Sequence, residues 1–449
     1  MPDSLGVAIR TSLVAAACVS VLAAGGCDRQ AGDPFSPRVV DSALPSAATA
    51  PPGAVNPPVL MATGHGPSGP PRESAPFVSG QAVVKLTPGI DLPAFNAKWG
   101  TSTIREVEGS AYVLVDLPPG GEWNWVGDFL ESGDCLDAQP DFVSETPESQ
   151  QGTIPIFEGG HVFGDVADQE AMSRINAPAA HLVATGTSVT VAILDTGIDA
   201  SHPALAPSVS PLAYDFVDED TNAGDVADGI DQDGDGLVDE GAGHGTHVAG
   251  IVHAVAPDAT LLAVRVLDSE GNGTSVSVAR GIRWAVQNGA DVLNLSLGMY
   301  ADVHVIREAI VDAVESGAVV VASAGNLGRD DRKHFPAQMS EVLAIAASDP
   351  QDGRAPFSNW GPHVDLAAPG VGILSTFLGQ GWAVWSGTSM STPMAAGGAA
   401  LRLQVDPTAR PQDVSDALQR TAAPLAIDGT PWEGKMGAGR LDLAALVVW

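Results

Sequence analysis

Between residues 190 and 403, short apolar runs alternate with segments long enough to form helices, and this alternation restricts the fold more than any other feature of the chain. Strands that are joined through helices pair in parallel, because the crossover returns the chain to the same end of the sheet. We therefore predict an α/β fold with a parallel sheet and helices on both faces. The predicted strands are 191–195, 261–267, 291–295, 318–322 and 342–346, and the helices between them are 275–288 and 302–316.

Polar residues follow several of these predicted strands. Asp195 closes the first run, and Ser296 and Asn326 come just after two later ones. Ligands of such sheets bind at the carboxyl ends of the strands. The sequence therefore predicts a functional site at this edge.

Ser389 stands where a glycine-bearing turn runs into a helix-forming segment rich in Ala and Gly, and Pro393 suits a first helical turn. Backbone N–H groups and the positive end of the helix dipole would surround this hydroxyl and could stabilise an oxyanion. A serine needs a general base. His244 begins a second small-residue segment, and it lies after Asp195 and before Ser389 in the chain.

Each of these residues also has a purely structural interpretation. An Asp after an apolar strand is commonly a turn former, and a Ser before a helix is commonly an N-cap. Independent caps would not produce this order and spacing, so we favour the catalytic interpretation. His247 is better explained as a structural histidine, and Ser391 excludes a lipase-type elbow, which requires glycine at that position.

Four motifs together resemble the subtilase (subtilisin-like) serine protease family, and the resemblance covers roughly residues 178–446. It implies that Asp195 orients the imidazole, that His244 is the general base and that Ser389 attacks the peptide carbonyl. It also implies an oxyanion hole made by the Asn326 amide and the Ser389 backbone N–H. The motifs are Leu194-Asp195-Thr196-Gly197, His244-Gly245-Thr246-His247-Val248-Ala249-Gly250, Ala324-Gly325-Asn326 and Gly387-Thr388-Ser389-Met390.

The resemblance further implies two backbone edges that pair with an extended substrate. Such pairing reads the main chain more than the side chains, and it implies broad specificity. These edges are Ser296-Leu297-Gly298 and Gly271-Asn272-Gly273.

An acidic loop at residues 231–240 predicts a calcium site, because acids at alternate positions followed by glycine are typical of the start of an EF-hand loop. The twelfth position holds Ala242 instead of glutamate, so the site would close differently. The alternative is a solvated acidic loop. The predicted ligands are Asp231, Asp233, Asp235, the Leu237 carbonyl, Asp239 and Glu240.

Residues 76–150 predict a separate small α+β domain, which resembles the propeptide of the same family. A propeptide assists folding and inhibits the active site, so we expect self-cleavage between Glu145 and Asp168 and a peptidase domain at 160–449. An accessory domain without inhibitory function is the alternative. The predicted strands are 81–86 and 111–116, and the predicted helices are 92–99 and 123–131.

Residues 1–26 predict an export signal, because the apolar stretch from Leu13 to Ala24 is too short for a stable membrane span. Residues 22–27 resemble a bacterial lipoprotein box that would lipidate Cys27; ordinary signal cleavage is the alternative. Residues 28–75 are rich in Pro, Ala, Gly and Ser without periodicity, and they predict a disordered linker. We therefore predict that the protein is exported and is either anchored to the cell envelope by lipid or secreted.

The chain carries 54 acidic and 21 basic residues. This balance argues against nucleic acid or anionic lipid as partners, because phosphate binding requires clustered Lys and Arg. The sequence therefore favours an exported serine endopeptidase made as a zymogen, with protein or peptide substrates and its own propeptide as inhibitor. The alternatives are a calcium-binding surface protein on an inactive protease scaffold and a processing protease with a narrow substrate range. An inactive scaffold would be expected to lose a triad or oxyanion residue, and none is lost.

Overall fold

The computed structural model describes residues 61–62, 75–149, 155–158, 160–234, 236–330 and 334–449. The predicted export signal, the lipidation site Cys27 and nearly all of the predicted linker lie outside these residues, as does Asp235.

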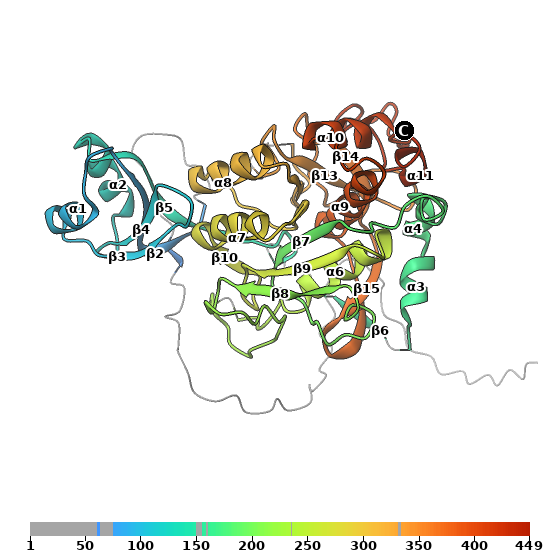
Figure 1. Ribbon diagram of the computed structural model, residues 1–449, viewed down its shortest axis with the longest axis horizontal. Coiled ribbons are helices and arrows are strands. Elements are labelled where there is room, and N and C mark those ends of the chain that lie inside the picture. Colours follow the sequence, from blue (N-terminus) through green and yellow to red (C-terminus); the bar gives the residue numbers. More distant parts are fainter. Residues whose placement is uncertain (1–60, 63–74, 150–154, 159, 235, 331–333) are drawn as a thin grey trace, which may run out of the picture. The chain divides into compact units, whose positions relative to one another are not determined.

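Seven parallel strands form the main sheet, in the order β14-β13-β12-β11-β7-β9-β8 (Figure 1). This confirms the predicted parallel sheet, and the structure adds edge strands β8 and β14 that the sequence pattern did not indicate. The strands are β7 (Thr190–Asp195), β8 (Val209–Asp215), β9 (Thr260–Arg265), β11 (Val292–Leu295), β12 (Val319–Ser323), β13 (Leu343–Ser348) and β14 (Leu366–Pro369).

Helices cover both faces of this sheet, as predicted. Val191 and Ile193 of β7 pack in one core with α6 and α9, whereas Ala192 and Leu194 pack in a second core with α7 and α8. Successive side chains of a strand point to opposite faces, so a strand buried on both sides reads as one continuous apolar run. These helices are α6 (His244–Val255), α7 (Ser275–Gln287), α8 (His304–Glu315) and α9 (Thr388–Val405).

The order of the strands reverses between β7 and β11. From β7 the chain continues to β8 and β9 on one side, and from β11 it continues to β12, β13 and β14 on the other. The loops that follow β7 and β11 therefore diverge and leave a crevice at the carboxyl edge. Asp195 ends β7, and Ser296 follows β11 at this point.

Helix α9 begins one residue before Ser389, and Pro393 is inside the helix instead of in its first turn as predicted. Proline has no N–H, so it cannot donate to the carbonyl four residues earlier. That carbonyl belongs to Ser389, and the Ser296 hydroxyl donates to it instead at 3.1 Å. Ser296 thus helps to hold the first turn of α9 against the end of β11.

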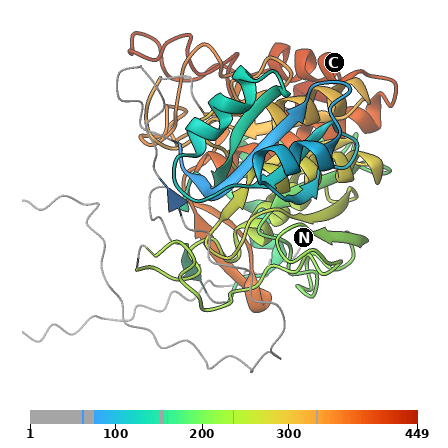
Figure 2. The same cartoon turned by 90° about the vertical axis from the view of Figure 1, so that its left-hand side faces the viewer.

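The N-terminal part of the described chain is a small α+β domain, also as predicted. Its antiparallel sheet has the order β5-β2-β4-β3, and helices α1 and α2 pack on one face of the sheet (Figure 2). Cys135 is a buried free thiol in that core. The elements are β2 (Phe77–Leu86), α1 (Leu92–Trp99), β3 (Thr103–Glu106), β4 (Tyr112–Asp116), α2 (Glu122–Glu131) and β5 (Cys135–Glu145), with β1 (Met61–Ala62) paired to β2.

The opposite face of this small sheet shares a core with α7 and α8. Ion pairs surround the shared core: Lys85 contacts Glu308 at 2.5 Å, and Glu108 contacts Arg280 at 2.6 Å. The N-terminal domain is therefore docked on the larger domain through apolar contacts with a charged rim.

A three-stranded antiparallel sheet with the order β15-β16-β6 brings the segment after the N-terminal domain against the larger domain. None of the helices in the described part of the chain is both long and apolar enough to cross a membrane. The remaining elements are β6 (Ile156–Glu158), α3 (Phe163–Asp168), α4 (Glu170–Arg174), α5 (Ala177–Ala180), β10 (Asn272–Thr274), β15 (Ile373–Phe377), η2 (Leu378–Gln380), β16 (Gly381–Trp385), α10 (Pro411–Arg420) and α11 (Leu443–Leu446).

Candidate active site

Asp195 and His244 are in direct contact, although 48 residues separate them in the chain. His244 is the first residue of α6, and its Nδ1 lies 2.7 Å from Asp195 Oδ1. A carboxylate only accepts, so Nδ1 carries the hydrogen. The Thr196 backbone N–H also donates to Asp195 Oδ1, at 2.8 Å. Asp195 thereby fixes the orientation of the imidazole and directs Nε2 toward the site.

Ser389 and Asn326 also lie at this carboxyl edge of the main sheet. Ser389 is the second residue of α9, and the Asn326 carbonyl oxygen accepts from the Thr388 backbone N–H at 2.9 Å and from the Thr388 hydroxyl at 2.8 Å. This contact turns the Asn326 NH₂ group away from Thr388 and toward the carboxylate of Glu148. All four predicted catalytic positions are therefore brought together, and their side chains are buried.

The carboxylate of Glu148 lies among these four side chains, and no sequence pattern predicted it there. Ser389 Oγ donates to Glu148 Oε2 at 2.5 Å, and His244 Nε2 lies 3.2 Å from the same oxygen. The Asn326 NH₂ donates to Glu148 Oε1 at 2.8 Å. The Glu148 carboxylate thus separates the Ser389 hydroxyl from the His244 imidazole. It also takes the hydrogen bond of the Asn326 amide, the group that would bind an oxyanion.

The same contacts change the protonation of His244. Burial alone would lower its pKa, but the charges and hydrogen bonds of Asp195 and Glu148 outweigh that effect and raise the pKa to about 10. At neutral pH the imidazole is consequently an imidazolium, which cannot accept a proton from Ser389. The contacts with Asp195 and Glu148 thus favour the charged form of His244.

The predicted substrate edges are occupied by strand β5 of the N-terminal domain. Glu145 exchanges two backbone hydrogen bonds with Gly298, at 3.0 and 2.9 Å, and Thr146 N–H donates to the Gly271 carbonyl at 3.0 Å. Strand β10 pairs antiparallel with β5, so that Asn272 lies opposite Glu145. The backbone at Glu145 and Thr146 thus runs extended between the two edges.

Ser296 and Leu297, which were predicted as part of one edge, have other contacts in this structure. The Ser296 carbonyl lies 3.4 Å from Ser389 Oγ, and Leu297 is buried in the second core.

After Thr146 the chain leaves the extended path and turns. The hydroxyls of Thr146 and Ser149 lie 2.5 Å apart, and the Ser149 hydroxyl donates to the Glu270 carbonyl at 3.0 Å. This turn directs the Glu148 side chain, instead of a peptide carbonyl, to Ser389 and Asn326.

Asp225 is a second residue that the sequence did not single out. Its buried carboxylate accepts from the backbone N–H groups of Gly243 and Thr246 at 2.9 and 3.0 Å, and so it holds the first turn of α6 that carries His244. Burial raises its pKa to about 6 despite these bonds. The acidic stretch around it gave no signal that could distinguish Asp225 from its solvated neighbours.

His247 has the structural environment expected for it. Its Nε2 lies 3.1 Å from the carbonyls of Ile373 and Ala383, and burial is the main cause that lowers its pKa to about 3. It is therefore neutral, and its Nε2 contacts strands β15 and β16.

Carboxylates of the acidic loop accept from backbone N–H groups of the loop and of the residues just before it. Asp231 accepts from the N–H groups of Gly234 and Gly236 at 2.6 and 3.1 Å, and Asp239 accepts from that of Asp228 at 2.8 Å. Within the described residues, no three or more His, Cys, Asp or Glu side chains are grouped so as to hold a metal ion. The predicted ligand Asp235 lies outside these residues.

Two oxygen atoms here are nevertheless buried without a hydrogen-bond partner among the described residues: Gln232 Oε1 within the loop and Glu270 Oε2 beside it. The other oxygen of Glu270 accepts from the Asp239 N–H at 3.0 Å, and the Gln232 amide contacts Ser269 at 3.3 Å. These atoms are oxygen ligands of the kind that calcium binds.

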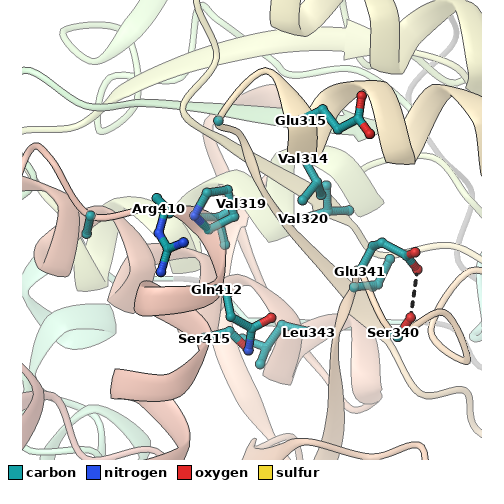
Figure 3. Close-up of a pocket in the computed structure, with 14 residues that line it drawn as sticks. Val314, Glu315, Val319, Val320, Ser340, Glu341, Leu343, Arg410, Gln412 and Ser415 are labelled. Atoms are coloured by element: carbon teal, nitrogen blue, oxygen red, sulfur yellow. Dashed lines mark hydrogen bonds between the residues drawn. The ribbon is translucent and has the colours of Figure 1, made fainter.

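A cavity of about 630 Å³ lies at the opposite end of the main sheet, where β12 and β13 begin (Figure 3). Val319 and Leu343 form part of its floor, and Glu315, Glu341 and Arg410 are exposed around it. The catalytic candidates lie at the other end of these parallel strands, so this cavity is not the active site.

A parallel sheet of this order, with Asp, His and Ser at its carboxyl edge, is the architecture of subtilisin-like serine proteases. The model of the Subtilase family matches residues 186–439, and the chain belongs to this family. Thermitase from Thermoactinomyces vulgaris is 39% identical over 281 residues, which cover 60% of this chain and 94% of thermitase. Subtilisin E from Bacillus subtilis (strain 168) is 40% identical over 288 residues, 61% of this chain and 71% of the relative. A solved protease structure from Pseudoalteromonas arctica PAMC 21717 superimposes with a TM-score of 0.55 at 33% identity, covering 61% of this chain and 93% of that one.

Proposed function

We propose that this serine protease hydrolyses peptide bonds through Asp195, His244 and Ser389, with Asn326 in the oxyanion hole, and that it is made as a zymogen. The observation that supports both parts best is the position of Glu148. Its carboxylate takes three hydrogen bonds from groups that would otherwise bind the transition state, and it does so at the end of a strand bound like a substrate.

Catalysis requires that Glu148 leaves. The pKa of His244 then falls, because one of the two carboxylates that raise it is gone, and Nε2 can take the proton of Ser389 Oγ as this oxygen attacks the carbonyl. The oxyanion that forms takes the place of Glu148 Oε1, where the Asn326 NH₂ and the Ser389 N–H stabilise it. His244 returns the proton to the leaving amine while Asp195 stabilises the imidazolium. Water then hydrolyses the acyl-enzyme by the same route.

Substrates would bind as β5 does, by backbone pairing with Gly298 on one side and Gly271 on the other. This mode accepts many sequences, so we propose a broad endopeptidase acting on proteins or peptides. An inactive scaffold is disfavoured because the four catalytic candidates are all present and lie around one carboxylate. A narrow processing protease would use the same geometry, with selectivity from its side-chain pockets.

We expect the purified full chain to process itself, with cleavage between Glu145 and Asp168, and to do so faster as pH rises. The His244 pKa of about 10 in the docked state exceeds its ordinary value of about 6.5. A raised pKa stabilises the docked state fully below about 6.5, and this contribution is lost as pH rises through about 10. The measurement is the rate at which the mass decreases and peptidase activity appears, which should increase at least about tenfold from pH 7 to pH 9.

The pH profile of the processed enzyme is the control. Without Glu148 its activity should rise with a midpoint near about 6.5 and level off above pH 8, since only the base must lose its proton. Processing that levels off with the same midpoint, or an amino terminus outside the expected range, would count against Glu148 as the group that raises the pKa.

We further propose that calcium binds at the acidic loop 231–240, including Gln232, together with Glu270, and that it stabilises the fold. Bound calcium would supply positive charge to this carboxylate-rich loop. A chelator should lower the melting temperature by about 5 °C, and added calcium should restore it. Replacement of Asp231 and Asp233 by alanine should abolish this calcium dependence. A melting temperature that responds equally to calcium in that variant would place the metal elsewhere.

Export is also part of the proposal. It rests on the apolar stretch and the small residues before Cys27, all in the first 27 residues of the sequence. Detection of a diacylglycerol-modified Cys27 by mass spectrometry would distinguish lipid anchoring from simple secretion.

A further inference from the structure

Pro147 follows the substrate-like part of β5 and stands where the chain reaches Ser389. Glu145 and Gly298 exchange both backbone hydrogen bonds as an antiparallel pair. In an antiparallel ladder the hydrogen-bonded pairs alternate with unbonded ones, so the next bonded pair would join residue 147 to Ser296. The Ser296 carbonyl lies 3.4 Å from Ser389 Oγ. Pairing with Ser296 would therefore bring the carbonyl of residue 147 to the nucleophile.

Pro147 cannot complete this pair, because proline has no N–H to donate to the carbonyl opposite. The extended path accordingly ends at Thr146, where the chain turns. The carboxylate of Glu148, instead of the Pro147 carbonyl, then accepts from Ser389 and from the Asn326 amide. The docked segment thus takes the place of a substrate without offering a carbonyl for attack.

The docked domain is also held so that it cannot advance a later bond to Ser389. Strand β5 is fixed in register by its pairing with β2 and β10. Asp141 of β5 is buried, and it accepts from the Ser275 hydroxyl at the start of α7 at 2.6 Å. A shift of β5 by a single residue would turn each of its side chains to the other face of the sheet. A bond beyond Glu148 therefore reaches Ser389 of the same copy only after the domain undocks.

The chain beyond Glu148 is accessible to another molecule at described residues. Ile156, Phe157 and Val162 are 65%, 67% and 62% exposed. An enzyme copy that has lost its N-terminal domain has no Glu148 carboxylate at Ser389, and its site is open to substrate. Such a processed copy can therefore act on the unprocessed chain of a second copy.

We propose that Pro147 makes the docked segment an inhibitor that its own active site does not cleave, and that one copy of the chain is processed by another at a bond beyond Glu148. The inference rests on the proposed peptidase function. Ser389 of the processed copy forms an acyl-enzyme with the N-terminal part of the second copy, and the new amine leaves with the proton that His244 took from Ser389. Water then releases the N-terminal part as a carboxylate. Copies whose segment has undocked start the reaction, and each processed copy accelerates it.

The first test follows the mass of the purified full chain over time at several concentrations. We expect a lag, which a trace of processed enzyme removes, and a new amino terminus beyond Glu148. Dilution by about tenfold should lower the fractional rate of processing about tenfold, because two copies must meet. The Ser389→Ala chain, which cannot cleave itself, should be cut at the same bond as the wild-type chain once processed enzyme is added.

The second test restores the missing N–H through Pro147→Ala. The ladder can then extend to Ser296, and the carbonyl of residue 147 replaces the Glu148 carboxylate at the Asn326 amide. We expect this variant to cleave itself before Glu148, at a rate that does not change on dilution. Pro140→Ala is the matched control, because Pro140 is in the same strand but pairs with Ala82 inside the N-terminal domain. It should be processed like the wild-type chain.

A wild-type amino terminus at Glu148, a fractional rate that does not change on dilution, or a Ser389→Ala chain that stays intact beside active processed enzyme would overturn the inference. These readouts do not depend on the folding of Pro147→Ala. Processing of Pro147→Ala at the same bond and with the same concentration dependence as the wild-type chain would also overturn it. The peptidase function stands in all these cases if the processed enzyme hydrolyses a fluorogenic peptide, and absence of that hydrolysis would overturn the proposed function itself.

Discussion

Replacement of Ser389 by alanine should reduce peptide turnover by about a millionfold and leave the full chain unprocessed. The reason is that His244 and the oxyanion hole have no nucleophile to activate, so only the small contribution of binding remains. The measurement is hydrolysis of a fluorogenic peptide, together with the mass of the chain after prolonged incubation.

Ser391→Ala is the matched control for this variant. Ser391 is in the same helix and equally buried, but its hydroxyl donates to the Ala368 carbonyl at 2.9 Å and not to the site. We expect this variant to retain activity within about threefold, since a single neutral hydrogen bond contributes about 1 kcal/mol to stability and nothing to the chemistry. Activity in Ser389→Ala that matches that of Ser391→Ala would exclude Ser389 as the nucleophile.

Replacement of Glu148 by alanine should have the second largest effect on peptide hydrolysis. It should raise the activity, because the unprocessed chain becomes active. Hydrogen bonds to a charged group contribute about 1.5–3 kcal/mol each. Loss of the carboxylate should therefore weaken docking of the segment by at least about 3 kcal/mol, which corresponds to about a hundredfold increase in the open fraction. The measurement is the initial rate of peptide hydrolysis by the full chain before any processing is detected.

Two variants separate the effect of the Glu148 carboxylate in the active site from general effects of charge. Glu106→Ala removes an exposed carboxylate from β3 of the same domain, and we expect no change in the initial rate. Glu148→Gln keeps the shape of the side chain without its charge, and an intermediate rate is expected. An initial rate of Glu148→Ala equal to that of the wild-type chain would show that docking of β5 alone keeps the enzyme latent.

The sequence predicted the fold well where a local pattern determines the structure. Strand β7 is buried on both faces, so its residues form one apolar run that ends at Asp195. The helices between the strands imply that the strands pair in parallel. Parallel pairing in turn implies that the functional site lies at the carboxyl ends of the strands. The small N-terminal domain was also predicted, although its strands β3 and β5 were not. Strand β5 contains Pro140 and several charged residues, which conceal the usual alternation.

The residues that the sequence could not indicate are those whose role comes from contacts between distant segments. Glu148 and Ser389 are 241 positions apart, and only the turn after Thr146 brings them together. Asp225 lies in an acidic stretch without a distinguishing pattern, and only its bonds to the N–H groups of Gly243 and Thr246 reveal its role. Pro393 was misplaced because its effect on α9 is compensated by Ser296, which follows β11 and is distant in the chain.

The most direct test is covalent labelling of the serine by phenylmethylsulfonyl fluoride, followed over time by mass spectrometry of the Ser389 peptide. We expect labelling of Ser389 in the processed enzyme, and labelling that is at least about a hundredfold slower in the unprocessed wild-type chain. The unprocessed Glu148→Ala chain should be labelled nearly as fast as the processed enzyme. Equal labelling of the wild-type chain before and after processing, or no labelling of Ser389 in the processed enzyme, would contradict these expectations.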